Sequence, residues 1–170
     1  FAAVEANAVD MVGCLLKQGA DINVPNAFGR PLLNHAIVWL GNAYKRAESG
    51  IDNDEEISER EEILDLLLEH PALNLEALNK LGWTAVPNAL REPKIIKKLI
   101  DRGAKIDFCH RKGRSLLGSL IATHESDELE ILLAYQPDPN LGSPTALSYA
   151  FKANDSKLIN RLLDLGGAPF

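Results

Sequence analysis

Apolar residues recur along the chain at helical spacing, and pairs of aliphatic residues stand near the end of five of the stretches that they form. The five pairs are Leu15-Leu16, Leu67-Leu68, Leu99-Ile100, Leu132-Leu133 and Leu162-Leu163. Each pair is followed by a turn signal that contains Gly or Pro, and both residues end helices. Two of these turns are similar to each other, Gly19-Ala20-Asp21-Ile22-Asn23 and Gly103-Ala104-Lys105-Ile106-Asp107. The pattern predicts a series of helices, each followed by a turn.

A second recurring block alternates with the aliphatic pairs. Its four copies are Gly29-Arg30-Pro31-Leu32-Leu33, Gly82-Trp83-Thr84-Ala85-Val86, Gly113-Arg114-Ser115-Leu116-Leu117 and Ser143-Pro144-Thr145-Ala146-Leu147. The residues that open the helical part of each copy, Pro31, Thr84, Ser115 and Thr145, lie 53, 31 and 30 residues apart. Two blocks that alternate in phase indicate an internal repeat, with one longer step near its start.

This block resembles the Thr-Pro-Leu-His-x-Ala motif of the ankyrin-repeat family, whose period of roughly 33 residues is close to the two shorter steps. The segment Thr145–Ala150 is the closest match, although no copy keeps both Thr and Pro and none keeps His. The resemblance covers essentially the whole chain. It implies an all-α fold, an ankyrin-type α-solenoid of stacked helix-turn-helix repeats joined by short hairpin loops, in which the Thr or Ser of the block caps the first helix of a repeat.

We therefore expect one ankyrin-repeat domain over residues 1–170. Its expected parts are a partial repeat at 1–24, a repeat at 25–77 with an insertion near 41–58, and repeats at 78–108, 109–138 and 139–170. Residues 1–8 are expected to hold the end of a first helix. Since the chain begins with Phe rather than Met, we also expect it to be a segment of a longer protein.

The insertion follows a helix that we expect to continue beyond its usual end, because Ile37, Leu40, Tyr44 and Ala47 keep helical spacing. The acidic stretch from Glu48 to Glu56 then predicts an exposed loop. After it, Ser58 and Glu61 form the pattern of a capping box that restarts a helix. The loop has two open interpretations, a docking arm for a basic partner or a solvated insertion that the fold tolerates.

Composition and charge narrow the possible partners. Hydrophobic residues make up 46% and charged residues 25% of the chain, which is ordinary for a folded protein. No apolar run approaches the roughly 18 residues that span a bilayer, so we expect a soluble protein without a membrane partner. We also expect it to be a monomer. The net charge of −6 disfavours nucleic acid as a partner. Two cysteines fit a reducing compartment, the cytoplasm, or a host-cell cytosol if the chain belongs to a secreted effector.

Candidate catalytic chemistry is weak. Adjacent residues of an extended hairpin point in opposite directions, so Cys109 and His110 form a poor pair of nucleophile and base. His124-Glu125 lacks the second His of a helical zinc site, and the chain contains no Cys-x-x-Cys motif and no phosphate-binding loop after a strand. The sequence predicts no enzyme, no catalytic residue, no metal and no cofactor.

The resemblance implies that a partner protein binds at the hairpin loops and the face of the first helices. Carried onto this chain position by position, the predicted binding residues are Phe28, Arg30, Lys80, Trp83, Arg91, Arg111, Lys112, Arg114 and Lys152. Several are basic, which favours a partner with an acidic face; the competing interpretation is that the loops are charged only for solubility. Trp83 and Arg114 occupy matching positions after a glycine, and we expect them to be near neighbours.

The sequence thus favours a non-catalytic module for protein–protein interaction. The alternative is the substrate-recognition ankyrin domain of a larger enzyme or effector whose catalytic part lies outside this chain. A catalytic motif upstream in the reading frame would favour the alternative.

Overall fold

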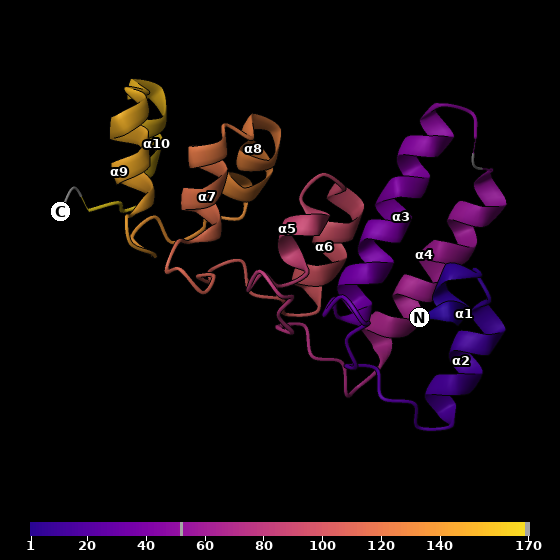
Figure 1. Ribbon diagram of the computed structural model, residues 1–170. Coiled ribbons are helices and arrows are strands. Elements are labelled where there is room, and N and C mark those ends of the chain that lie inside the picture. The colour runs from indigo at the N-terminus through magenta and orange to yellow at the C-terminus, as the bar shows by residue number, and fades with distance from the viewer. Residues whose placement is uncertain (52, 169–170) are drawn as a thin grey trace. The chain divides into compact units, whose positions relative to one another are not determined.

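The computed structural model describes residues 1–51 and 53–168, and it divides into two compact units, Phe1–Ala104 and Lys105–Phe170. Within the described residues the regular elements are helices, as expected, and they follow one another in pairs (Figure 1). Unit 1 contains α1 (Ala2–Glu5), α2 (Val9–Lys17), α3 (Leu32–Glu48), α4 (Asp54–Glu69), α5 (Val86–Ala89) and α6 (Pro93–Asp101). Unit 2 contains α7 (Leu116–Thr123), α8 (Ser126–Ala134), α9 (Ala146–Ala153) and α10 (Ser156–Asp164).

The aliphatic pairs fall near the ends of the second helices, α2, α4, α6, α8 and α10, as their spacing predicts. One member of the pair is fully buried in four of these helices: Leu67, Leu99, Leu132 and Leu162. Leu15 and Leu163 are the exposed members of their pairs, on α2 and α10. The five-repeat division of the chain itself stays a prediction.

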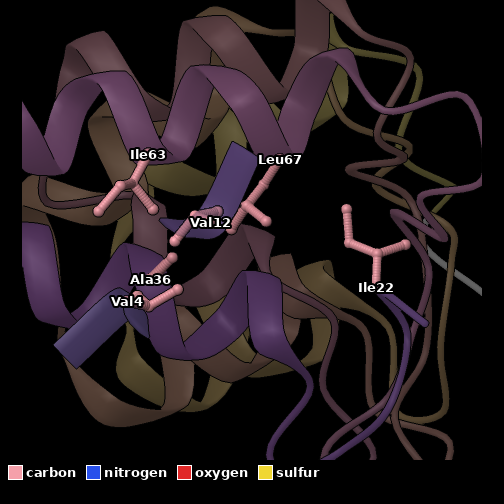
Figure 2. Packing of buried hydrophobic residues seen from close by; sticks show 6 residues of the cluster. All are labelled: Val4, Val12, Ile22, Ala36, Ile63 and Leu67. Atoms are coloured by element: carbon pink, nitrogen blue, oxygen red, sulfur yellow. The ribbon is translucent and has the colours of Figure 1, made fainter. Parts of the chain in front are cut away.

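The core at the start of unit 1 shows how neighbouring pairs share their apolar residues (Figure 2). Its buried members are Val4, Val12, Ile22, Ala36, Ile63 and Leu67, contributed by α1, α2, the turn after α2, α3 and α4. The α1–α2 pair is too short to enclose these side chains alone. It buries them against α4, and α3 in turn packs on both α4 and α5.

Two of the predicted helix caps are present and one is not. The N–H of Gly118 donates to Ser115 Oγ at 3.1 Å, and the N–H of Ser148 donates to Thr145 Oγ1 at 3.4 Å. The predicted cap at Thr84 is wrong, because the residue three positions on is Pro87, which has no N–H to donate. Helix α5 begins after Ala85, its N-cap, and is a single four-residue turn.

The insertion lengthens α3 and α4, which Figure 1 shows as two long neighbouring helices. The expected extension of α3 is confirmed, and the described residues from Glu48 to Asp54 are exposed. The capping box at Ser58 is wrong: α4 begins four residues earlier, where Asn53 Oδ1 accepts the N–H of Glu56 at 2.8 Å. Residue 52 lies outside the described residues.

The side chains at this point explain the difference. The acidic residues 54–56 fill the first turn of α4, where negative charge is favoured by the helix dipole. Glu61, expected to complete the capping box, instead accepts a hydrogen bond from the Tyr44 hydroxyl at 2.5 Å and so fastens the extension of α3 to α4. The residue before it, buried Arg60, donates to Asn7 Oδ1 at 3.0 Å and lies over the ring of Trp39.

Side-chain hydrogen bonds also join successive turns within each unit. Asn23 donates to the carbonyl of Ala72 at 2.7 Å and accepts from the N–H of Asn74 at 2.8 Å. In unit 2, Asn140 donates to the carbonyl of Gly166 at 3.0 Å and accepts from Ala168 at 2.7 Å. Asparagine carries both a donor and an acceptor, so one side chain pairs with two backbone groups of the next turn.

Leu132→Ala is expected to lower the free energy of unfolding by roughly 2–5 kcal/mol, because a fully buried leucine leaves a cavity when it is truncated. Chemical denaturation followed by circular dichroism measures the change. The matched control is Leu163→Ala, which removes the same atoms from a side chain that is 42% exposed. Equal effects of the two substitutions would contradict the assigned register.

Asn53→Ala is expected to destabilise the protein by about 1 kcal/mol, since it removes the side-chain acceptor at the start of α4. Asn53→Asp keeps the acceptor and should retain most of the stability. Ser58→Ala, inside α4, serves as the comparison. If Ser58→Ala costs as much as Asn53→Ala, the helix starts at the predicted capping box and not at Asn53.

Candidate functional site

Three hairpin loops precede α3, α5 and α7 and carry most of the predicted binding residues. We call residues 26–30 loop 1, residues 79–83 loop 2 and residues 110–114 loop 3. Loops 1 and 2 belong to unit 1 and loop 3 belongs to unit 2. Loops 1 and 3 are flanked by isolated antiparallel bridges, Pro25 with Pro31 and Cys109 with Ser115.

The first residue of each loop holds the turn in place. In loop 1, Asn26 Oδ1 accepts the N–H groups of Phe28 and Arg30, both at 3.0 Å. In loop 2, Asn79 Oδ1 accepts the N–H groups of Leu81 and Trp83, at 2.9 and 3.1 Å. In loop 3, His110 Nδ1 accepts the N–H two positions on at 2.9 Å. These bonds fix the backbone of each loop before any partner is present.

The fourth residue of each loop is a glycine with a positive φ: +68° at Gly29, +82° at Gly82 and +78° at Gly113. Residues with a side chain are strained in this left-handed region, so glycine is the residue that the turn requires. The third residue therefore stands at the tip, immediately before the reversal of the chain.

The tips of unit 1 expose large apolar side chains. Phe28 is 80% exposed and Leu81, at the equivalent position of loop 2, is 73% exposed. The aliphatic part of the Lys80 side chain, from loop 2, lies directly on the backbone of loop 1 at Gly29. A Cβ atom added to Gly29 would be only 2.6 Å from Lys80 Cε, so the two loops are in contact. Arg30 is exposed at the end of loop 1. These side chains form the unit 1 tip surface: Phe28, Arg30, Lys80 and Leu81.

Trp83 and Arg114 both occupy the fifth loop position and are both partly buried. They lie in different units, so their proximity stays a prediction. Arg91 is exposed, but its expected place on a first helix is wrong, because α5 ends at Ala89 and Arg91 lies in the turn before α6. The chain has already turned toward α6 at this point, because Pro93 opens α6 and the residue before it, Glu92, is extended.

Unit 2 brings two of the predicted binding residues onto one aromatic ring. The Arg114 guanidinium lies 5.3 Å from the centroid of the Tyr149 ring, and the Lys152 ammonium lies 5.9 Å from the same centroid. Arg111 and Lys112 are exposed at the tip of loop 3. Tyr149 had no place among the predicted residues, and it is the side chain that gathers the cations.

The comparisons with known proteins agree with this architecture. Residues 1–27 match the family model described as ankyrin repeat. A search of curated protein sequences finds no match. Among solved structures, the crystal structure of an ankyrin repeat domain from Acinetobacter baumannii AYE is similar to this chain with a TM-score of 0.65 at 20% identity, and the match covers 98% of this chain and 80% of that one.

The chain has the ankyrin-repeat fold. Ankyrin repeat domains generally act as modules for protein–protein interaction and are typically non-catalytic. The hairpin loops that carry the predicted residues are therefore the repeating loops of the ankyrin fold. Their exposed side chains are the candidate binding surface for a partner protein.

The reactive groups nearest to these ankyrin loops are poorly suited to covalent chemistry. Burial raises the pKa of the Cys109 thiol, which lowers the fraction of thiolate at neutral pH. The pKa of His110 is lowered, first by burial and then by the charges of Arg114 and Lys112. Both shifts favour the neutral forms of the two side chains.

Among the described residues, no group of three or more His, Cys, Asp or Glu side chains is placed to hold a metal ion. In residues 1–51 and 53–168, none of the helices combines the length and the apolar character that crossing a bilayer requires.

The first ankyrin helices carry two surface hollows. One, of about 370 Å³, lies between α2 and α4 beside Gly13, Cys14 and Leu66. The other, of about 230 Å³, is mostly apolar and lies beside Phe1, Leu15 and Val24. Neither hollow contains one of the predicted binding residues.

The sequence signal for Leu81 was available. Leu81 stands immediately before the loop 2 glycine, as Phe28 stands before the loop 1 glycine. Aligning the two loops places Leu81 at the tip position that Phe28 occupies in loop 1. Lys80 and Trp83 of loop 2 were predicted from the sequence as binding residues, and Leu81 was left out. Tyr149 offered no such signal, because it lies inside a helix and its role depends on which loop packs beside it.

Proposed function

We propose that this chain is a non-catalytic protein-binding module and that a partner protein docks on the unit 1 tip surface. The observation that carries the proposal is the exposure of Phe28 and Leu81 on two touching loops. A large apolar side chain in water at a rigid loop tip gains free energy when a partner covers it. Because Asn26 and Asn79 already fix the loops, little backbone entropy is lost on binding.

The polar residues around the two tips give this surface the usual composition of an interface, an apolar centre with charged residues at its margin. Arg30 is exposed beside Phe28, and the Lys80 stem lies between the loops. Trp83 and Arg91 extend the proposed surface along loop 2 and the turn before α6. The basic margin favours a partner whose own margin is acidic.

We also infer a reducing compartment, the cytoplasm, for this module. Cys14 and Cys109 are both free and exposed. Exposed thiols persist where glutathione and thioredoxin keep them reduced.

Phe28→Ala and Leu81→Ala are each expected to weaken partner binding by about 1–3 kcal/mol, in the range of interface hot spots, with little change in thermal stability. The partner is first isolated by affinity capture with mass spectrometry, and affinity is then measured by titration calorimetry. The matched control is Ile51→Ala, which removes an apolar side chain that is 65% exposed in the loop between α3 and α4.

The control separates the two interpretations of the insertion. If Ile51→Ala weakens binding and the two tip substitutions do not, the partner docks on the insertion and the proposal is wrong. If the tip substitutions lower the midpoint of thermal unfolding, Phe28 and Leu81 serve the fold and not binding.

A further inference from the structure

Tyr149 is held rigidly at the surface of unit 2. Helix α9, which carries it, packs against α7. The ring lies directly on the backbone of Gly118 in α7, because a Cβ atom at that position would come within 3.2 Å of Tyr149 Cε2. A glycine inside a helix is unfavourable on its own. Here its missing side chain makes room for the ring, which becomes a fixed platform on the surface.

Two cations share this platform. Arg114 reaches it from the end of loop 3, and Lys152 reaches it from α9, three residues after Tyr149 and so on the same side of the helix. Two like charges drawn to one ring repel each other, and the attraction of each cation to the aromatic face offsets part of that repulsion. An anion placed between them would remove the rest.

Neither cation forms an ion pair with a carboxylate among the described residues. Elsewhere in the chain basic residues do have such partners: Lys98 lies 2.6 Å from Asp65, and in unit 2 Arg161 lies 2.5 Å from Glu130. In this respect Arg114 and Lys152 differ from Lys98 and Arg161. The charges of Arg114 and Lys152 can therefore interact with a group outside the chain.

The surroundings add to the positive potential. Arg111 and Lys112 are exposed on loop 3, next to Arg114. The pKa of His110 is lowered first by burial and then by the charges of Arg114 and Lys112, so both cations act on this ring. His110 Nδ1 accepts the Lys112 N–H, which leaves Nε2 as the N–H donor of the neutral ring.

We propose that Arg114 and Lys152, together on the Tyr149 ring, bind carboxylate side chains of an acidic segment of a partner protein. A guanidinium offers two parallel N–H donors that match the two oxygens of a carboxylate, and the ammonium adds a second charge beside it. This inference rests on the proposed function, because it adds a second contact, in unit 2, for a protein partner.

The test uses the full chain and a fluorescein-labelled peptide of alternating Glu and Gly, 12 residues long, in fluorescence anisotropy at low salt. Binding of the Glu-Gly peptide is expected, with no binding of the matched Gln-Gly peptide. Arg114→Gln and Lys152→Gln should each weaken binding about fivefold or more, and the affinity should fall as salt is raised, because exposed charges are screened. Tyr149→Phe should bind normally and Tyr149→Leu weakly, since the leucine lacks the ring.

The matched control is Lys157→Gln, which removes the same charge from an exposed position on α10. Equal losses from Lys152→Gln and Lys157→Gln would show binding by net charge alone and overturn the proposal. Tighter binding of the same peptide with phosphoserine in place of Glu, by tenfold or more, would assign the cluster to phosphate instead of carboxylate. Self-association of the chain that Arg114→Gln abolishes would make the occupant a second copy.

The two proposals fail separately. Phe28→Ala and Leu81→Ala should leave binding of the Glu-Gly peptide unchanged, because they lie in unit 1. Loss of the natural partner in those variants, together with full partner binding by Arg114→Gln, would retain the proposed function and reject this second contact. Full partner binding by all of these variants would reject both.

Discussion

A pair of short helices cannot bury its own apolar face, and this constraint governs both units of the chain. The buried leucines of the second helices, Leu67, Leu99, Leu132 and Leu162, are sheltered by packing between helix pairs as well as within them. The constraint also explains the exposed leucines. Leu15 and Leu163 lie on α2 and α10, the second helices of the first and last helix pairs along the described chain, and each is the exposed member of its aliphatic pair. Polar side chains such as Asn23 and Asn140 then fix the spacing of successive turns, because each pairs with two backbone groups of the next turn.

The same arrangement produces the candidate binding surface. Once the turns are fixed, the loops between them stand at a set spacing, and Asn26, Asn79 and His110 complete each loop from within. The side chain at the tip is therefore free to vary without affecting the fold, which separates stability from recognition. In unit 1 the tips carry Phe28 and Leu81, whereas the equivalent position in unit 2 is Lys112. One fold thus presents an apolar surface in one unit and a basic surface in the other.

The order of helices and loops follows from the sequence because two periodic signals, the aliphatic pairs and the glycine blocks, alternate in phase. The errors come from single residues that change a local hydrogen bond. Pro87 removes the N–H that Thr84 would have capped, and Asn53 starts α4 in an acidic stretch whose low hydrophobicity suggested a loop. The candidate site was predicted less completely. The family resemblance predicted Phe28 and Arg114 from their loop positions and Lys152 from its position on a first helix. The role of Tyr149 depends on contact between α9 and loop 3, and no linear pattern records that contact.

The central proposal is that a partner docks on the rigid loop tips of unit 1. Hydrogen–deuterium exchange of the chain with and without its captured partner tests this proposal directly. The backbone amides of loops 1 and 2 are expected to exchange more slowly when the partner is bound, and those of loop 3 as well if the basic surface also takes part. Protection confined to the loop between α3 and α4, or to the outer faces of α2 and α4, would contradict the proposal.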